Sequence, residues 1–279
     1  MNRFLTHRFF TYRAGVAGAV VLAATALIAV IAPLLIDPAA LDVTRVTAAA
    51  WQAPNAGSWL GTDHTGRSVA LLVAQGAGTS LFVGLTAAVL AVGIGTLVGI
   101  LSGHFGGFLA GALLRVTDFF LVLPALVLAI ALSTVLPRGL GTIVLAIGLT
   151  SWPSTARMVR AQTLTIEARP FVERARALGG GHGHVIGRHV LPSVVPLVLV
   201  NATLAVASAI VAESTLAFLG LGDPTRISWG SMLHQAQLHG AVPQGAWWFL
   251  LPPGLAIVVV VLAFTLVGRA LEAVVTPKR

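Results

Sequence analysis

The feature that most constrains this chain is where its charges lie. From Ser68 to Leu114 there is no Asp, Glu, Lys or Arg, and long apolar runs recur along the sequence. Only 9% of the 279 residues are charged and 57% are hydrophobic. A soluble domain carries roughly 25% charged residues. Because so few charges cannot cover a water-exposed surface, we expect most of the chain to lie in lipid.

The spacing of the apolar runs predicts six membrane-spanning helices in an all-α polytopic fold. A bilayer core of about 30 Å needs about 20 mostly apolar residues per helix. The runs lack the alternation of barrel strands, which disfavours a β-barrel. The expected spans cover residues 14–36, 79–101, 116–136, 140–156, 194–216 and 249–267. The first is longer than the apolar region of a signal peptide, so we expect it to be retained.

These spans suggest two parts of the chain. Residues 1–77 comprise an N-terminal tail, the first span and an external segment. Residues 78–279 form a core with five spans. A second external segment, residues 220–248, lies between the last two spans and holds Asp223, Arg226 and three Trp residues.

Lysine and arginine indicate which side of the membrane each loop occupies. The N-terminus, the turn at Arg115, the segment 157–188 and the C-terminus hold 13 of the 17 such residues. The opposite loops hold the remaining four, which are Arg45, Arg67, Arg138 and Arg226. The positive-inside rule therefore places both termini in the cytoplasm.

The residues that are missing exclude several kinds of chemistry. There is no cysteine, which excludes disulfides, thiolate metal sites and cysteine nucleophiles. The only lysine is Lys278, so the chain cannot complete a phosphate-binding loop or hydrolyse ATP by that route. The basic residues form short clusters between apolar runs, which does not favour nucleic-acid binding. A membrane enzyme is disfavoured because the eight histidines lie almost wholly in loops.

An ion-gradient-driven secondary transporter is the main alternative class. Such proteins tend to contain internal repeats, broken helices and several charges at mid-membrane. Here Glu213, near the outer end of the fifth span, is the only acid deep inside an apolar run. A pathway role is the default hypothesis for such a carboxylate, and a structural cap or pair is the other explanation. Asn201 is a second pathway candidate, although an interhelical hydrogen bond explains it more simply.

The longest predicted cytoplasmic segment, residues 157–192, contains a short amphipathic helix. Pro170 suits a first helical position and Gly179 a C-terminal cap. The apolar face of this helix consists of Phe171, Val172, Ala175 and Leu178. The opposite face consists of Glu173, Arg176 and Ala177. A helix this short is marginal alone. Its apolar face could therefore rest on the chain's own bundle while Glu173, Arg174 and Arg176 meet a partner. A solvated loop is an equally open interpretation of the residues alone.

A histidine pair follows this helix, as His182-Gly183-His184. With no acidic or cysteine partner nearby, the pair makes a poor metal site, and no metal is expected.

At this point the sequence resembles a known family. The run from Phe171 to Gly179, followed by Leu191-Pro192, is similar to the cytoplasmic loop of binding-protein-dependent ABC importer permeases. That loop carries Glu-Ala-Ala, three residues, Gly, and a later Ile-x-Leu-Pro. Two positions depart from the pattern: Arg174 replaces the first Ala, and His189 stands where Ile is expected.

Further motifs resemble one branch, the C-type permease of dipeptide, oligopeptide and nickel importers. They occur in the order that is typical of this branch. The motifs are Gly61-Thr62-Asp63-x-x-Gly66-Arg67, Gly103-His104-Phe105-Gly106-Gly107, Leu149-Thr150-Ser151-Trp152-Pro153, Phe218-Leu219-Gly220-Leu221-Gly222 and Ser228-Trp229-Gly230-Ser231-Met232. Each alone is weak, and together they are specific.

The resemblance implies a type I ABC importer permease in a bacterial inner membrane. It implies a homologous second permease, two ATPase domains that bind ATP and Mg, and an extracytoplasmic substrate-binding protein as partners. No cofactor is expected in this chain. Residues implied to dock an ATPase are Phe171, Glu173, Arg174, Ala175, Arg176, Leu178 and Gly179. Residues implied to contact the binding protein are Asp63, Arg67 and Trp229, although Asp63 and Arg67 could instead pair with each other. The substrate is left open among peptides, nickel complexes, haem and glutathione.

Overall fold

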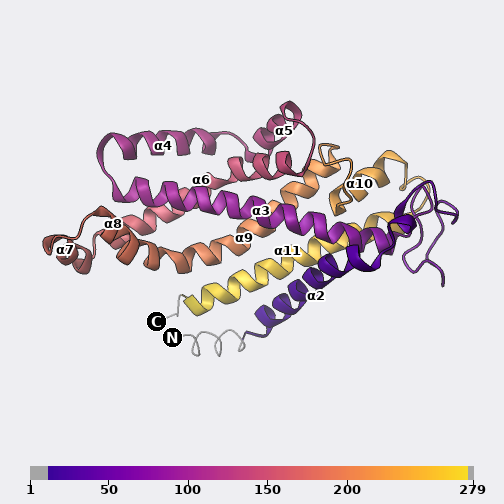
Figure 1. Cartoon of the computed structure of the whole chain (residues 1–279), viewed down its shortest axis with the longest axis horizontal. Helices are drawn as coiled ribbons and strands as arrows, with labels where there is room; N and C mark the ends of the chain where they lie inside the picture. Colours follow the sequence, from indigo (N-terminus) through magenta and orange to yellow (C-terminus); the bar gives the residue numbers. More distant parts are fainter. Residues whose placement is uncertain (1–11, 276–279) are drawn as a thin grey trace.

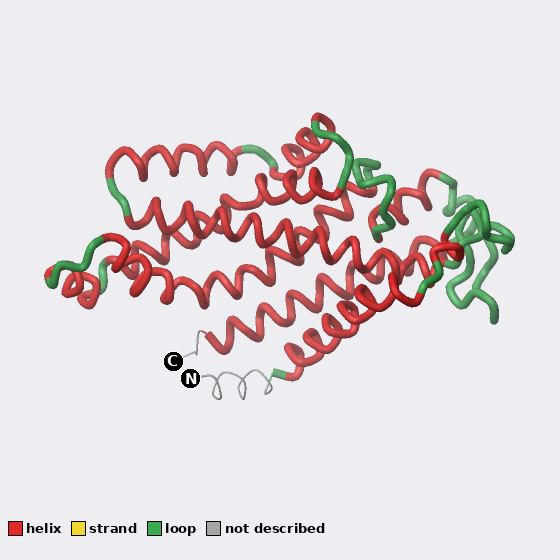
Figure 2. The backbone as a smooth tube through the Cα atoms, in the orientation of Figure 1, coloured by secondary structure: helices red, strands yellow, loops and turns green. Residues whose placement is uncertain are grey.

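The computed structural model describes residues 12–275 of the chain. The expectations that concern Arg3, Arg8, Lys278 and Arg279 lie outside these residues. Within 12–275 the chain is helical and contains no β-strand, only isolated bridges at residues 55–58 and 62–68 (Figure 2). The all-α prediction is confirmed.

The long helices lie side by side along the longest axis of the molecule (Figure 1). They are α2 (Arg13–Leu35), α3 (Val69–His104), α6 (Leu140–Glu167), α9 (Leu191–Phe218) and α11 (Trp247–Val275). α3 is the longest and packs against each of the other four. The shorter elements are η1 (Pro38–Leu41), α4 (Gly107–Val122), α5 (Ala125–Val135), α7 (Pro170–Ala177), α8 (His182–Val185), the π-helical turn η2 (Ile186–Val190) and α10 (Trp229–Leu238).

Four helical stretches among the described residues are long and apolar enough to cross a membrane. These are α2, α3, α11 and the continuous run His182–Phe218 that joins α8, η2 and α9. The pair α4 and α5 adds a fifth if it is counted as one span. α6 is not among them, because Trp152, Pro153 and Arg157 dilute its apolar content.

The prediction of one continuous third span over 116–136 is wrong. α4 begins earlier, at Gly107, and α5 follows it at a bend of 89°. Pro124 causes the break, because proline lacks the backbone N–H of a helix and forces the preceding residue out of the α region. Leu123 accordingly adopts an extended conformation, with φ −83° and ψ 133°.

Two other predicted bounds change. α3 begins at Val69 and therefore crosses the proposed division between residues 77 and 78 without a break. α6 continues past residue 156 to Glu167, where the sequence predicts a polar loop. Arg157 and Arg160 indicate where the sequence becomes polar. They do not interrupt the helix, because Arg is a good helix former.

A glycine-lined seam joins α3 to α6. Gly95, Gly99 and Gly103 follow each other at intervals of one helical turn and face α6. A Cβ on Gly99 would lie 2.7 Å from the carbonyl oxygen of Ala156 and from the Cβ of Val159. Small residues let helix backbones approach closely where lipid supplies no hydrophobic drive. α3 and α6 therefore form one closely packed unit.

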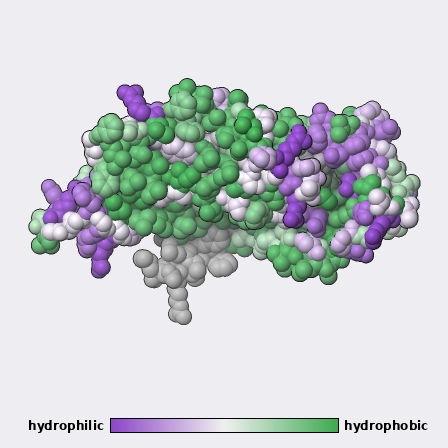
Figure 3. Space-filling view, turned by 45° about the horizontal axis from the view of Figure 1, so that its top comes forward, coloured by the Kyte–Doolittle hydropathy of each residue, from purple (hydrophilic) through white to green (hydrophobic). Residues whose placement is uncertain are grey.

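The two ends of this bundle carry the candidate sites. α7 and α8 lie at one end, here called the α7 end. The N-terminal end of α2 and the C-terminal end of α11 point toward it (Figure 1). Residues 37–68 and α10 lie at the other end, here called the α10 end. Apolar residues cover the middle of the molecule in Figure 3, and hydrophilic residues gather at both ends. This arrangement fits a lipid-facing belt between two watery faces.

Candidate functional site

The predicted short helix exists as α7, from Pro170 to Ala177. Pro170 occupies its first turn, where the missing N–H costs nothing. Gly179 has φ +86°, and its N–H donates to the carbonyl of Arg176 over 2.9 Å. Gly180 N–H donates to the carbonyl of Ala175 over 2.9 Å, which completes a Schellman motif. The proline and glycine brackets are both confirmed.

The expected orientation of α7 is wrong. Val172 is fully buried against the bundle, whereas Phe171 is 41% exposed and Leu178 is 89% exposed. The apolar face is therefore divided, because Val172 rests on the chain's own bundle while Phe171 and Leu178 do not. Arg176, expected to face a partner, is 46% exposed, and its Nη2 donates to Glu167 Oε2. The reason is that α6 continues to Glu167 and so places a carboxylate next to Arg176 of α7. The predicted loop at residues 157–167 did not imply this contact.

The exposed residues of α7 border a hollow. Phe171, Arg174, Ala175 and Leu178 line it from α7, and His184 and His189 line it from the following turn. Its volume is about 520 Å³. Glu173 lies on the surface beside it. Two large apolar side chains at a polar end of the molecule are typical of a contact surface.

The histidine pair after α7 serves packing and hydrogen bonding. His182 Nδ1 lies 2.8 Å from Nε2 of His104, and the His184 ring lies against the His189 ring at a centroid distance of 5.6 Å. Among the described residues no three of His, Cys, Asp and Glu are grouped so that they could hold a metal ion.

At the α10 end, Asp63 and Arg67 pair with each other. Asp63 is fully buried, and its Oδ2 accepts from both Nε and Nη2 of Arg67 over 2.8 Å. Oδ1 accepts from the backbone N–H groups of Thr65 and Arg67. Gly66 has φ +91°, which favours glycine. This motif therefore builds the loop, as the alternative explanation proposed.

The side chain of Trp229 also lies inside the chain, where it is 2% exposed. Its Nε1–H donates to the carbonyl of Val73 over 2.9 Å. Ser228 caps α10, because its side chain accepts from the N–H of Ser231. A Cβ on Gly230 would lie 2.6 Å from the Cα of Ser214, so α10 sits directly against α9.

Glu213 joins three helices rather than standing alone in lipid. Its carboxylate is 1% exposed and accepts from the hydroxyls of Ser80 on α3, over 3.2 Å, and Ser214 on α9, over 3.3 Å. The Ser80 hydroxyl in turn accepts from the N–H of Trp229 over 3.2 Å. These contacts are of the kind expected if Glu213 serves as a structural cap or pair.

Asn201 makes the interhelical hydrogen bond that the sequence suggested. Its Nδ2 donates to Thr155 Oγ1 on α6 over 2.9 Å. Asn201 also lines a cavity of about 140 Å³ between α3, α6 and α9, together with Ser151, Ser154 and Ser208. Several hydroxyls therefore line this space, which opens to the surface at the exposed residues Ser154 and Ser208.

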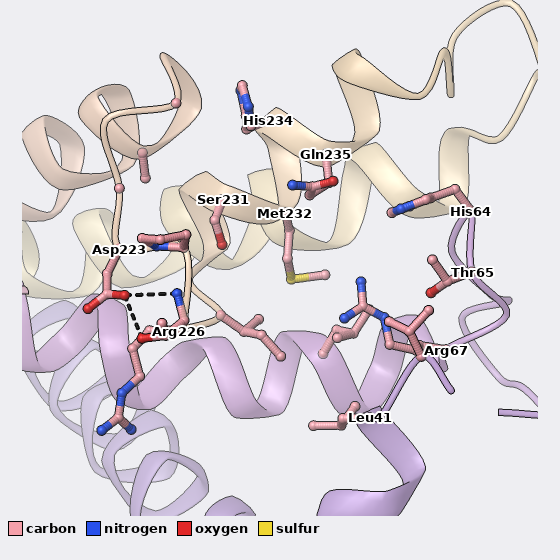
Figure 4. A pocket seen from close by; sticks show the side chains of 18 of the residues that line it. Leu41, His64, Thr65, Arg67, Asp223, Arg226, Ser231, Met232, His234 and Gln235 are labelled. Carbon is pink, nitrogen blue, oxygen red and sulfur yellow. Dashed lines mark hydrogen bonds between the residues drawn. The ribbon is translucent and has the colours of Figure 1, made fainter. Parts of the chain in front are cut away.

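A larger cavity, of about 600 Å³, lies at the α10 end, mainly between residues 41–72 and residues 217–235 (Figure 4). Arg67 and His64 enter it from one side, and Met232 and Gln235 enter it from α10. Burial lowers the pKa of His64, whose ring stacks on that of His239 at 3.6 Å. Hydrogen bonds from Thr225, above all that of its hydroxyl, hold the pKa of Asp223 below its usual range.

The residue that sequence reasoning missed is Glu167. Both of its carboxylate oxygens are engaged, one by Arg176 and one by His104. The sequence offered one indication of its role, which is that Glu167 lies three residues before Pro170, where the short helix begins.

Comparisons with known proteins agree with these features. The family model for the binding-protein-dependent transport system inner membrane component matches residues 95–279. A peptide permease protein of Brucella suis biovar 1 is 37% identical over 227 residues, which cover 81% of this chain and 75% of the relative. A peptide transport system permease protein of the same organism is 38% identical over 229 residues, covering 82% and 76%.

A third relative is the glutathione transport system permease protein of Pectobacterium atrosepticum. It is 32% identical over 228 residues, which cover 81% of this chain and 75% of the relative. The family model spans more than half of the chain. The chain therefore belongs to the inner-membrane components of binding-protein-dependent transport systems, and it is a permease of the ABC importer type.

Proposed function

We propose that this permease receives ATP-driven motion from an ATPase that docks on α7. The observation that carries the proposal is the exposure of Phe171 and Leu178 beside the hollow at the α7 end. Glu173 and Arg174 flank this apolar patch and supply a charged rim. A buried apolar centre with a polar rim is the usual composition of a protein interface. Arg176 is left out of the docking surface because it pairs within the chain.

We infer six spans, with both termini in the cytoplasm. α6 is 28 residues long, or about 42 Å at the usual rise per residue, and it packs along α3 inside the bundle. Thr150, Thr155 and Thr163 of α6 are buried against protein there, which supports its role as a further span. The described ends of α2 and α11 share the α7 end, as an even number of spans requires. The excess of Arg and Lys on this side supports a cytoplasmic α7 end.

The partners follow from the family description and from what this chain lacks. A binding-protein-dependent system contains, in general, a partner permease, an ATPase and a binding protein. This chain has no lysine apart from Lys278, so we assign ATP and Mg to two partner ATPase domains. We assign half of the translocation pathway to this chain and the other half to a homologous permease. An ion-gradient-driven transporter remains the alternative that the experiment below must exclude.

The substrate that we propose is a peptide or a related small solute. Relatives named as peptide and glutathione permeases support this class. The external segments would meet the loaded binding protein around the cavity at the α10 end (Figure 4). Asp63 and Trp229 are enclosed, so they would act by shaping this surface rather than by touching the partner.

Within the bundle, we propose that Asn201 borders the pathway. It lines the cavity between α3, α6 and α9 whose other polar members are hydroxyls. Glu213 would border the pathway only if its three helices separated. Transport after Glu213→Gln decides this point, because full activity would remove Glu213 from the pathway.

The docking proposal is tested with the complex of this chain, its partner permease and its ATPases in proteoliposomes without an ion gradient. Glu173→Lys and Leu178→Asp should abolish co-purification of the ATPases and the stimulation of ATP hydrolysis by the binding protein. Glu272→Lys is the matched control, since Glu272 is exposed on α11. Unchanged co-purification and stimulation in both α7 variants would contradict docking on α7. Uptake that is absent with ATP alone and appears when an ion gradient is imposed on the same proteoliposomes would favour the alternative class.

A further inference from the structure

The carboxylate of Glu167 holds two other helices at the end of α6. Its Oε2 accepts from Nη2 of Arg176 on α7, and its Oε1 accepts from Nδ1 of His104, the last residue of α3. The Glu167 side chain is 11% exposed, and that of His104 is fully buried. Each oxygen therefore serves a different element: the contact with His104 is shielded from water, and Arg176 approaches from the solvent side with a side chain that is 46% exposed.

The contact continues from His104 to a fourth element. Because Nδ1 of His104 donates to a carboxylate, Nε2 remains for another bond, and it lies 2.8 Å from Nδ1 of His182. His182 is the first residue of α8. The ring of Phe105 covers the pair, with centroid distances of 4.8 Å to His104 and 5.2 Å to His182. Arg176, Glu167, His104 and His182 thus form one chain of polar contacts across α7, α6, α3 and α8.

α7 has few other attachments to the bundle. Val172 is its one buried residue, and Phe171 and Leu178 face outward. The contact between α3 and α6 is close by contrast, because the glycine seam lets the two helix backbones approach each other directly. A displacement of α7 reaches α6 through residues 168–169, which join the two helices. It reaches the rest of the bundle through Val172, through the contact of Phe171 with His189 and through the pair of Arg176 with Glu167.

We propose that Glu167 is the positioning residue that makes α3 follow α7. It touches no substrate and no ATP, and it acts by passing the motion of the docked helix into the longest helix of the bundle. This inference rests on the proposed docking of the ATPase on α7. Coupling of this kind requires a physical connection between two sites, which the four-residue chain of contacts supplies.

The test uses the complete complex and a reporter inside the bundle. Ser208 faces the cavity between α3, α6 and α9, and this chain contains no cysteine, so Ser208→Cys introduces one alkylation site into it. ATP should change the rate at which a maleimide labels this site in the parent chain. In Glu167→Gln we expect the ATPases to remain bound and to hydrolyse ATP, while the ATP-dependent change in labelling falls at least about tenfold.

Two further variants keep the test decisive. Arg176 is exposed, so Arg176→Gln removes the contact without a buried change in case Glu167→Gln fails to fold. Arg176→Gln should lose the labelling response, and Arg176→Lys should restore it because a cation again meets Glu167. Glu272→Gln is the control and should respond as the parent does.

The outcomes separate the inference from the proposed function. A full labelling response in Glu167→Gln and in Arg176→Gln would overturn the role of Glu167 alone. Loss of the ATPases from Glu167→Gln would also overturn it, because Glu167 would then shape the docking surface. A parent complex whose labelling ignores ATP would contradict the proposed function itself.

Discussion

The two ends of α3 are held by different kinds of contact. At the α7 end, His104 meets the Glu167 carboxylate, which also binds an Arg176 side chain that is 46% exposed. At the α10 end, Ser80 joins Glu213 to the backbone of Trp229, and the side chains there are buried. The first set is charged and open to solvent on one side. The second is enclosed.

This difference indicates which end changes during a transport cycle. A partly exposed ion pair is screened by salt and costs little to break and remake. Hydrogen bonds to a buried carboxylate are expensive to lose, because the unpaired group stays desolvated. If an ATPase docks on α7 as proposed, we infer that the α7 end moves with it, while the contacts at the α10 end keep α3, α9 and α10 together. α3 itself is 36 residues long without an internal proline, so it can connect the two ends as one rod.

The largest effect is expected from breaking the buried pair at the α10 end. Asp63→Asn leaves Arg67 without its carboxylate, so we expect a loss of about 3–5 kcal/mol in the free energy of unfolding. Asp42→Asn removes the exposed pair with Arg45 in the same segment and should change stability little. Thermal unfolding of the purified chains in detergent measures both. Equal effects would show that burial does not distinguish these pairs.

The next prediction concerns the glycine seam of α3, the helix that connects the two ends. Gly99→Leu drives a side chain into Ala156 and Val159, and overpacking of this kind costs about 1–3 kcal/mol. Gly93→Leu is the matched control on the same helix, since no atom lies within 4 Å of a Cβ there. Unfolding in an SDS titration should separate the two variants. A destabilised Gly93→Leu and a tolerated Gly99→Leu would contradict the seam.

Glu213 sharpens the comparison at the α10 end. Glu213→Leu removes the acceptor that Ser80 and Ser214 share, and leaving hydroxyls unpaired costs about 1–3 kcal/mol. Glu213→Gln retains an acceptor and should unfold close to the parent temperature. If Glu213→Leu unfolded at the higher temperature, the hydrogen bonds to Glu213 would contribute less to stability than the cost of burying its polar group.

The smallest effect is expected from pH. Burial lowers the pKa of His64 below its ordinary 6.5, against the opposing pull of Asp63 and with the help of His239 and Arg67. The folded chain then binds fewer protons than the unfolded chain, so stability falls as pH drops from 6.5 toward the folded pKa. His64→Phe should flatten this dependence of the unfolding temperature between neutral and mildly acidic pH. If the unfolding temperature of His64→Phe depended on pH as steeply as that of the parent, the pH dependence would arise from another group.

Much of the fold follows from the sequence, and the failures have physical causes. Apolar run length predicted the long helices α2, α3 and α11, and Pro170 with Gly179 predicted α7, because these signals are local. The bend at Pro124 was missed because the run 116–136 is apolar throughout, although its proline was visible. The facing of α7 was missed because it depends on Glu167, whose position follows only once α6 is known to continue. Ser80, Glu213 and Trp229 lie far apart in the sequence and meet only through packing.

Cross-linking at α7 tests the central claim most directly. In the assembled complex, Leu178→Cys should form a cross-link to an ATPase subunit through a short bifunctional reagent, because Leu178 is 89% exposed on the proposed docking face. Val172→Cys should form none, because Val172 is fully buried against the bundle. No cross-link from Leu178→Cys, or equal cross-linking from both positions, would contradict the docking of the ATPase on the exposed face of α7.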